Sequence, residues 1–156
     1  MKTQLKKAKH LWTVIAQGSV TDSLTNNLSI NNVLEQIQIG KHDASGKTII
    51  PTKGEAIPIN FQIISLWKKL TDQKDEFSID GKLEVLDPSG KVLVSQLYSI
   101  AMMKDKERMR SIINFQGFKI TLPGEYTFKL YARDNSRDNF VEVAEDYLTI
   151  QFSIAG

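Results

Sequence analysis

Apolar and polar residues alternate with a period of two through most of the chain. In the segment Leu122–Tyr131, apolar Tyr126, Phe128 and Leu130 alternate with other residues directly after a Pro-Gly pair. This period is typical of a strand with one face buried and the other in water. The segment therefore predicts a Pro-Gly turn that leads into a strand, and Asp134–Asn135 predicts the turn that ends it.

The same alternation predicts further strands elsewhere in the chain. Asp87–Gly90 places Asp, Pro and Gly at the first, second and fourth positions of a type I turn, so the strands beside it are expected to form an antiparallel hairpin. Gly117 predicts a bulge within its strand. The expected strands are His10–Gln17, Ile57–Lys69, Lys82–Leu86, Val92–Ser99, Ser111–Ile120 and Tyr147–Ile154.

Two of these strands show which side chains share a face. Trp12, Val14 and Ala16 alternate in the first of them. In Ile57–Lys69 the apolar residues recur at every second position, and Ser65 is the exception. Each set is therefore expected to lie on one face of its strand.

Two segments leave alternatives open. Ile30–Ile39 has apolar residues at helical spacing, but its β-branched residues and the asparagines within it favour a strand interrupted by Glu35. That glutamate is expected to face an edge or a buried cation. Met102–Arg110 is polar and suits either a long hairpin connection or a short helix.

Short strands with turns between them, and without alternating helices, indicate a sandwich or a barrel. About eight or nine strands are expected, with at most one or two short helices. The chain has 156 residues, no internal repeat and no cysteine, so it is long enough to bury a core without disulfides. We expect a basic N-terminal tail over residues 1–9 and one domain over residues 10–156.

Longer stretches add a resemblance to a known group of proteins. The sequence KLEVLDPSGKVL, then a polar stretch, then INFQGFKITLPGEYTFKLYARDN and a closing strand resembles short uncharacterised bacterial proteins with an immunoglobulin-like β-sandwich. The opening VTDSLTNNLSINNVLEQIQI is similar to their first strands, so the resemblance covers residues 11–152. It implies an all-β fold, a single antiparallel immunoglobulin-like sandwich, and a bacterial origin. It implies no activity.

The net charge of +2, from 20 basic and 18 acidic residues, produces no field that would steer the protein to nucleic acid or membrane. Neither partner is expected. Trp67–Lys69 combines an aromatic with basic residues, as single-strand binders do, but a core tryptophan at a strand end is the favoured interpretation. The apolar run Leu11–Ala16 after the basic N-terminus is too short for a signal peptide, so a cytoplasmic location is expected.

Groups for catalysis are sparse. Of the two histidines, His10 follows the basic tail and His42 lies in a loop beside Asp43 and Ser45. Adjacent loop residues do not form a catalytic triad, because each role requires its own fixed approach. No glycine-rich phosphate loop is present. We therefore predict no catalytic residue and no cofactor.

Three acidic loops offer oxygen ligands that calcium could use. None matches an EF-hand loop, and Lys74, Arg133 and Arg137 would compete as ion-pair partners. Polar turns are the favoured interpretation, and no metal site is predicted. The loops contain Asp72, Asp75 and Glu76; Asp134, Asn135, Asp138 and Asn139, with Glu142 nearby; and Asp105 and Glu107.

Missing catalytic arrangements favour a non-catalytic binding or assembly module, acting through end loops or an edge strand, over an enzyme. Tyr147–Ile154 is a predicted edge because its outward residues are mainly uncharged, and we expect a protein partner or self-association. The alternative is a small metal-assisted hydrolase with carboxylate ligands. The predicted binding loop consists of Arg133, Asp134, Asn135, Arg137 and Asp138.

Overall fold

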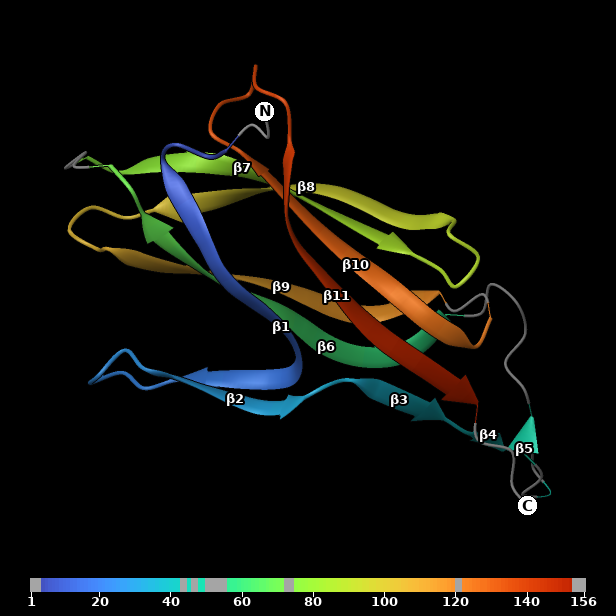
Figure 1. The fold of residues 1–156 in the computed structure, drawn as a ribbon. Helices are drawn as coiled ribbons and strands as arrows, with labels where there is room; N and C mark the ends of the chain where they lie inside the picture. The colour runs from blue at the N-terminus through green and yellow to red at the C-terminus, as the bar shows by residue number, and fades with distance from the viewer. Residues whose placement is uncertain are drawn as a thin grey trace.

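The computed structural model describes residues 4–42, 45, 48–49, 56–71, 75–119 and 122–152. In these residues nine strands form two facing sheets, and no helix is present, so the prediction of an all-β sandwich is confirmed (Figure 1). Accordingly, no helix that could span a membrane occurs in this part of the chain.

The two sheets differ in size. The first contains, in spatial order, β2 (Leu28–Val33), β1 (Ala8–Thr21), β6 (Ala56–Lys69) and β9 (Arg108–Lys119). The second contains β3 (Gln36–Ile39), β11 (Val141–Phe152), β10 (Gly124–Arg133), β7 (Phe77–Leu86) and β8 (Val92–Met102). A separate ribbon pairs β4 (Lys41–His42) with β5 (Thr48–Ile49).

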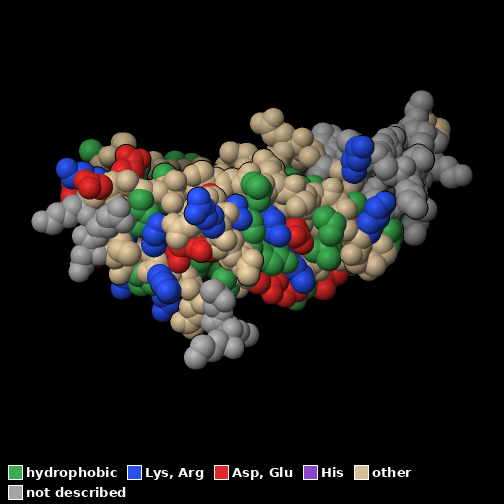
Figure 2. Space-filling model, turned by 90° about the horizontal axis from the view of Figure 1, so that it is seen from above, with side chains coloured by type: hydrophobic (Ala, Val, Ile, Leu, Met, Phe, Trp, Pro, Cys, Tyr) green, Lys and Arg blue, Asp and Glu red, His purple; other side chains and the backbone are tan. Residues whose placement is uncertain are grey.

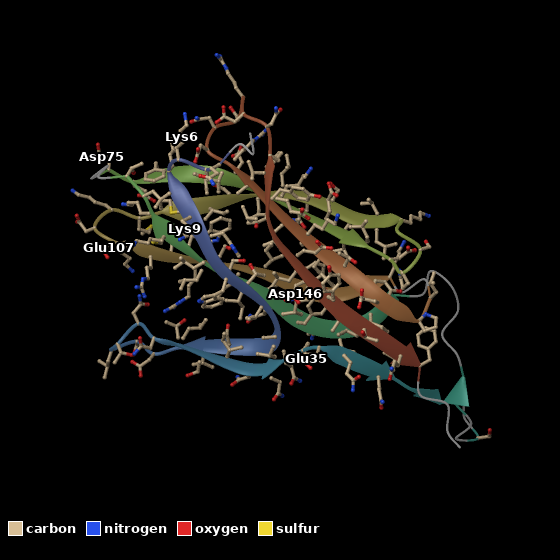
Figure 3. The ribbon with its side chains drawn as sticks, in the orientation of Figure 1. Lys6, Lys9, Glu35, Asp75, Glu107 and Asp146 are labelled. Atoms are coloured by element: carbon tan, nitrogen blue, oxygen red, sulfur yellow. The ribbon has the colours of Figure 1, made fainter. Side chains whose placement is uncertain are left out.

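The ambiguous segment Ile30–Ile39 is extended, as favoured, and is divided between the two sheets. β2 pairs with β1, and β3 pairs in parallel with β11, which is the parallel exception among otherwise antiparallel pairs. At the crossing the Leu34 N–H donates to the Ile15 carbonyl (2.8 Å), and the Thr149 N–H donates to the Glu35 carbonyl (3.0 Å). The Glu35 side chain is exposed beside edge strand β3, which matches one of its two expected environments (Figure 3).

The hairpin predicted at Asp87–Gly90 is confirmed. The Gly90 N–H donates to the Asp87 carbonyl (2.9 Å), and Gly90 has a φ of 87°. The Asp87 carboxylate accepts from the N–H groups of Ser89 (2.8 Å) and Lys91 (3.0 Å). These bonds account for a carboxylate residue that is only 4% exposed.

The Pro-Gly turn before β10 packs on that same hairpin. Gly124 has a φ of 136°, and a Cβ atom there would lie 2.9 Å from Pro88 Cγ. The Tyr126 hydroxyl donates to the Leu122 carbonyl (2.6 Å), a contact that resembles the tyrosine corner of immunoglobulin-like sandwiches. The two strongest turn signals of the sequence therefore meet at one end of the sandwich.

The core lies between the sheets in two clusters. In the larger one, the Phe61 and Phe115 rings of the first sheet stack at 4.7 Å, and the Phe128 ring of the second sheet meets Phe61 edge-on at 5.9 Å. In the smaller one, Trp67 packs among Ala8, Ile79, Ile100, Met102 and Ala132. The predicted inward face of β6 is confirmed.

Ser65, the exception in that face, is buried and belongs to a row of three hydrogen-bonded polar side chains. Its hydroxyl lies 2.7 Å from the Thr13 hydroxyl, which lies 2.6 Å from His10 Nε2. The polar atoms are thus paired with one another, as buried groups require. Burial lowers the pKa of His10, and the backbone hydrogen bond at Trp12 opposes this shift.

A bulge in β1 decides which of its residues face the core. The register with β6 shifts between His10 and Trp12, and Ile15 then enters the larger cluster. Trp12, Val14 and Ala16 share a face as predicted, but alternation places that face opposite to Ile15, where Trp12 and Val14 are partly exposed and Ala16 is fully buried. β1 also bends, so its first part pairs with β6 and its second part with β2 (Figure 1).

Of two other irregularities, one precedes β9 and the other lies in its pairing with β6. The segment Met102–Arg110 is a connection without a helix that carries the chain from β8 to β9, with Asp105 at a φ of 61°. A second register shift, between Ile57 and Asn60 of β6, lies opposite Gly117, which has a φ of 82°. Two residues of β6, Pro58 and Ile59, stand opposite the single residue Gly117, so the bulge predicted within the strand of Gly117 lies instead on its partner strand.

Candidate functional site

The predicted binding loop follows β10 and is partly bound to its own domain. The Arg133 Nε donates to the Asp80 carboxylate (2.8 Å), and its guanidinium lies 4.2 Å from the centre of the Phe140 ring. Asn135 donates to the Asp138 carboxylate from its backbone and its side chain, whereas Arg137 is exposed. The structure therefore places Asn135, Arg137 and Asp138 in one compact turn, and Arg133 joins that turn to β7 through Asp80.

Asp134, the fifth, binds the N-terminal segment. Its carboxylate accepts from the backbone N–H groups of Lys6 (2.7 Å) and Lys7 (3.0 Å), and the Lys7 ammonium donates to the Asn135 side chain (2.8 Å). β1 begins at Ala8, two residues before the expected start of the domain. Asp134 thus anchors the chain immediately before β1 to the far end of the sequence.

Replacing Asp134 by alanine is expected to lower the free energy of unfolding by about 1–2 kcal/mol, because two N–H donors lose a charged acceptor. The matched control is Arg137→Ala in the same loop, which should change stability by less than about 0.5 kcal/mol because that side chain is exposed. Urea denaturation measures both values. Equal losses in the two variants would contradict the anchoring role of Asp134.

The predicted edge at Tyr147–Ile154 is wrong for Thr149–Phe152. β11 lies between β3 and β10, and its residues Thr149–Phe152 pair with Gln36–Ile39 of β3. Ser153 and Ile154 lie outside the described residues. This part of β11 needs no charged residues to protect it, because β3 already pairs with it. β3 reaches this position only because the chain crosses from the first sheet to the second after β2.

The long open edges lie at the other side of the sandwich. β8 ends the second sheet, β9 ends the first, and a groove of about 590 Å³ lies between them. Apolar side chains that are exposed near these edges are Val92, Leu97, Met103 and Ile112.

Tyr98 forms part of that groove. Its ring packs on Gly81 of β7, where an added Cβ atom would lie only 2.4 Å from Tyr98 Cζ. Its hydroxyl is buried and has no hydrogen-bond partner among the described residues. Burial raises the pKa of Tyr98 to about 12, so the side chain is neutral at physiological pH.

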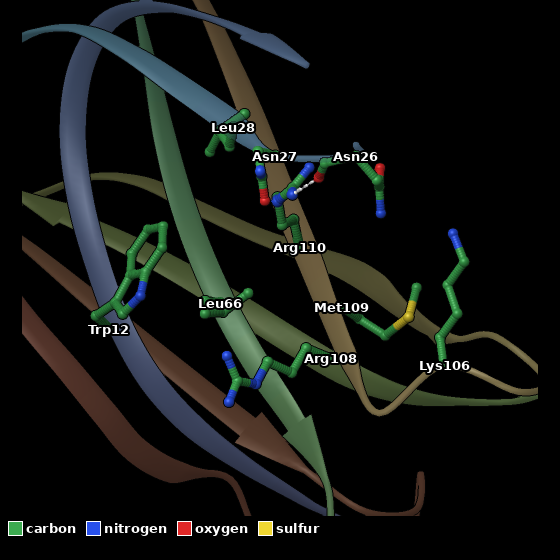
Figure 4. Close-up of a pocket in the computed structure, with 9 residues that line it drawn as sticks. All are labelled: Trp12, Asn26, Asn27, Leu28, Leu66, Lys106, Arg108, Met109 and Arg110. Carbon is green, nitrogen blue, oxygen red and sulfur yellow. Dashed lines mark hydrogen bonds between the residues drawn. The ribbon is translucent and has the colours of Figure 1, made fainter. Parts of the chain in front are cut away.

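A second hollow, of about 430 Å³, lies on the outer face of the first sheet and is called the Trp12 hollow below (Figure 4). The indole of Trp12 and the side chain of Leu66 supply its apolar part, and the lining also contains three cationic residues. The lining residues are Trp12, Asn26, Asn27, Leu28, Leu66, Lys106, Arg108, Met109 and Arg110.

The sequence did not indicate the Trp12 hollow, because its residues come from four separate segments. The signal that the sequence did offer for this hollow was the basic run Lys104–Arg110. In the structure, Arg108 of this run pairs with Lys68 of β6. Seen from above in Figure 2, basic and acidic side chains are mixed over the visible surface rather than gathered by sign.

Groups for metal or acid–base chemistry do not converge in the described part of the chain. No set of three or more His, Asp or Glu side chains there could hold a metal ion. Burial raises the pKa of Asp146, and the hydrogen bond from the Tyr147 N–H (2.8 Å) opposes this shift. Asp43 and Asp72, named above as candidates, lie outside the described residues.

Comparison with known proteins identifies no family for this chain. No protein-family model matches the chain, and no curated protein matches it either. The C-terminal domain of wzt is 11% identical with a TM-score of 0.43, over 97% of this chain and 77% of that one. A β-glucosidase from Listeria innocua, in complex with isofagomine, is 9% identical with a TM-score of 0.44, over 78% of this chain and 15% of that one.

Proposed function

We propose that this protein is a non-catalytic assembly module that pairs with a second copy of itself through edge strand β8. One observation carries the proposal: β8 is an open edge of eleven residues without a single charged side chain, proline or glycine. Edge strands that stay unpaired are usually protected by lysines, prolines, bulges or short length. β8 has no lysine and no proline and is long, and its one bulge, at Leu93, lies near its beginning and leaves Val94–Met102 in regular register.

The other three edges differ from β8 in this respect. β3 has four residues and β2 has six, so each offers few backbone groups for pairing. β9 has twelve residues, but Arg108, Arg110 and Lys119 lie along it. Like charges on two copies of β9 would repel each other on pairing, whereas two copies of β8 bring no charges together.

The position of Leu97 fits a twofold arrangement. Two identical strands that pair antiparallel about a twofold axis place the central residue of each opposite its equivalent. Leu97 is the middle residue of Val92–Met102, and it is 61% exposed. In the proposed dimer the two Leu97 side chains meet at the axis and bury apolar surface that is in water in the monomer.

Leu97→Lys is expected to weaken dimer formation by about tenfold or more, because it places two ammonium groups at the axis. The matched control is Val20→Lys, since Val20 is 60% exposed on β1 and lies outside the proposed interface. Sedimentation velocity over a range of concentrations measures the dimer fraction. A wild-type protein that stays monomeric at all concentrations, or equal weakening in both variants, would contradict the proposal.

A further inference from the structure

The Trp12 hollow carries an inference that is independent of this assembly. We propose that it binds a small anion that carries a flat ring, with the phosphate or carboxylate group on Arg108 and the ring against Trp12. The arrangement of charge, the partly exposed tryptophan and the size of the hollow each support this ligand class.

The charge of the hollow selects an anion. Lys106, Arg108 and Arg110 line it, and none of its described lining residues is acidic. The Arg110 guanidinium donates to the Asn26 carbonyl, so it is held in place by the β1–β2 hairpin. Arg108 is exposed and has no ion-pair partner within the described ranges, which leaves its planar donors available for a phosphate or carboxylate.

The tryptophan favours a ring. The bulge in β1 turns Trp12 away from the core, where Trp67 already fills the smaller cluster. Trp12 pairs with Leu66 in the register of β1 and β6, so these two side chains form the apolar part of the hollow, and Arg108 and Arg110 lie near them (Figure 4). A flat ring against an indole is a favourable contact in water, and a nearby cation then fixes the orientation of the ligand.

The shape limits the size of the ligand. A hollow of about 430 Å³ falls within the range of pockets for small molecules. Proteins that bind single-stranded nucleic acid present several aromatics in succession, whereas Trp12 is the one aromatic among the described residues that line this hollow. The geometry therefore suits a ligand of mononucleotide size rather than a polymer.

The test uses the two indole N–H resonances of the protein, because the chain has only two tryptophans. Trp67 is fully buried and donates to the Ser111 hydroxyl (3.0 Å), so its resonance serves as an internal control. The full chain is titrated with AMP, adenosine, inorganic phosphate and benzoate. AMP and benzoate are expected to shift the Trp12 resonance and leave that of Trp67 in place.

The probes also distinguish the two anionic groups and the two halves of the ligand. A stronger effect of AMP assigns the site to phosphates, and a stronger effect of benzoate assigns it to carboxylates. Adenosine, which has the ring alone, is expected to bind at least about tenfold more weakly than AMP. An equal response to adenosine, or a response to inorganic phosphate as strong as to AMP, would overturn the proposal.

Arg108→Gln is expected to weaken AMP or benzoate binding by about tenfold. Lys104→Gln is the matched control, because it removes one positive charge from the same connection at an exposed residue outside the lining. An unchanged Trp67 resonance shows that each variant is folded. Equal affinities of the two variants, or no shift of the Trp12 resonance with any probe, would refute the assignment.

Discussion

Trp67→Ala is expected to lower the free energy of unfolding by about 3–5 kcal/mol. Trp67 is the largest side chain that is fully buried, and it fills the smaller core cluster between the two sheets. Its loss leaves a cavity and removes the bond from the indole N–H to the Ser111 hydroxyl (3.0 Å). A typical domain has only about 5–15 kcal/mol of stability, so the variant is expected to be close to unfolding.

Trp12→Ala supplies the matched control for this measurement. Trp12 lies on the outer face and is only partly buried, so its removal leaves no closed cavity and a smaller loss is expected. Urea denaturation, with comparison of midpoints and slopes, measures both variants. A loss for Trp67→Ala no larger than that for Trp12→Ala would contradict the placement of the two indoles on opposite faces of the sheet.

Gly81→Ala is expected to lower the free energy of unfolding by about 3 kcal/mol, at the upper end of overpacking effects. A Cβ atom at this position would lie 2.4, 2.6 and 2.8 Å from Cζ, Cε2 and Cε1 of Tyr98. A rigid ring cannot bend away at those atoms, so the whole side chain must move. Gly81 faces Tyr98 in the pairing of β7 with β8, and the displacement would therefore disturb this hairpin.

Two further variants separate this contact from the general effect of replacing a glycine. Gly18→Ala should change stability by less than about 1 kcal/mol, because nothing lies within 4 Å of a Cβ atom there. In a Tyr98→Ala background, Gly81→Ala should also have little effect, because the ring is gone. A Gly81→Ala effect that persists without the ring would show that the packing of Tyr98 is not its cause.

The proposed dimer strand and the Trp12 hollow are neighbours. Met109 and Arg110 of β9 line both the hollow and the groove between β8 and β9. The test of the hollow can therefore be repeated on Leu97→Lys, which is expected to be monomeric. Retained AMP or benzoate binding in this variant would show that the hollow functions without the dimer.

Features that depend on neighbouring residues were predictable from the sequence. Asp87–Gly90 forms its turn through bonds within five residues, and Gly124 and Tyr126 close theirs through a bond to Leu122. The alternation in β6 and β10 predicted their buried faces, because successive side chains of a strand point to opposite sides. These local rules were sufficient for the all-β sandwich.

Features that depend on contacts between distant residues were not predictable from the sequence. Whether β11 lies at an edge depends on β3, which follows a crossing between sheets more than a hundred residues earlier. The predicted loop at Arg133–Asp138 gave no sign that Asp134 binds the backbone of Lys6, 128 residues away. Neither β11 nor the loop at Arg133–Asp138 has a local sequence feature that indicates which distant segment it contacts.

The face that Trp12 occupies shows the physical reason most directly. The sequence determined that Trp12, Val14 and Ala16 lie together, since a period of two is a property of the strand itself. One extra residue between His10 and Trp12 then reverses which side of the sheet they occupy, because a shift of one residue exchanges the two faces. The sequence alone thus determined strands, turns and shared faces, whereas the tertiary structure decided which faces and edges reach solvent.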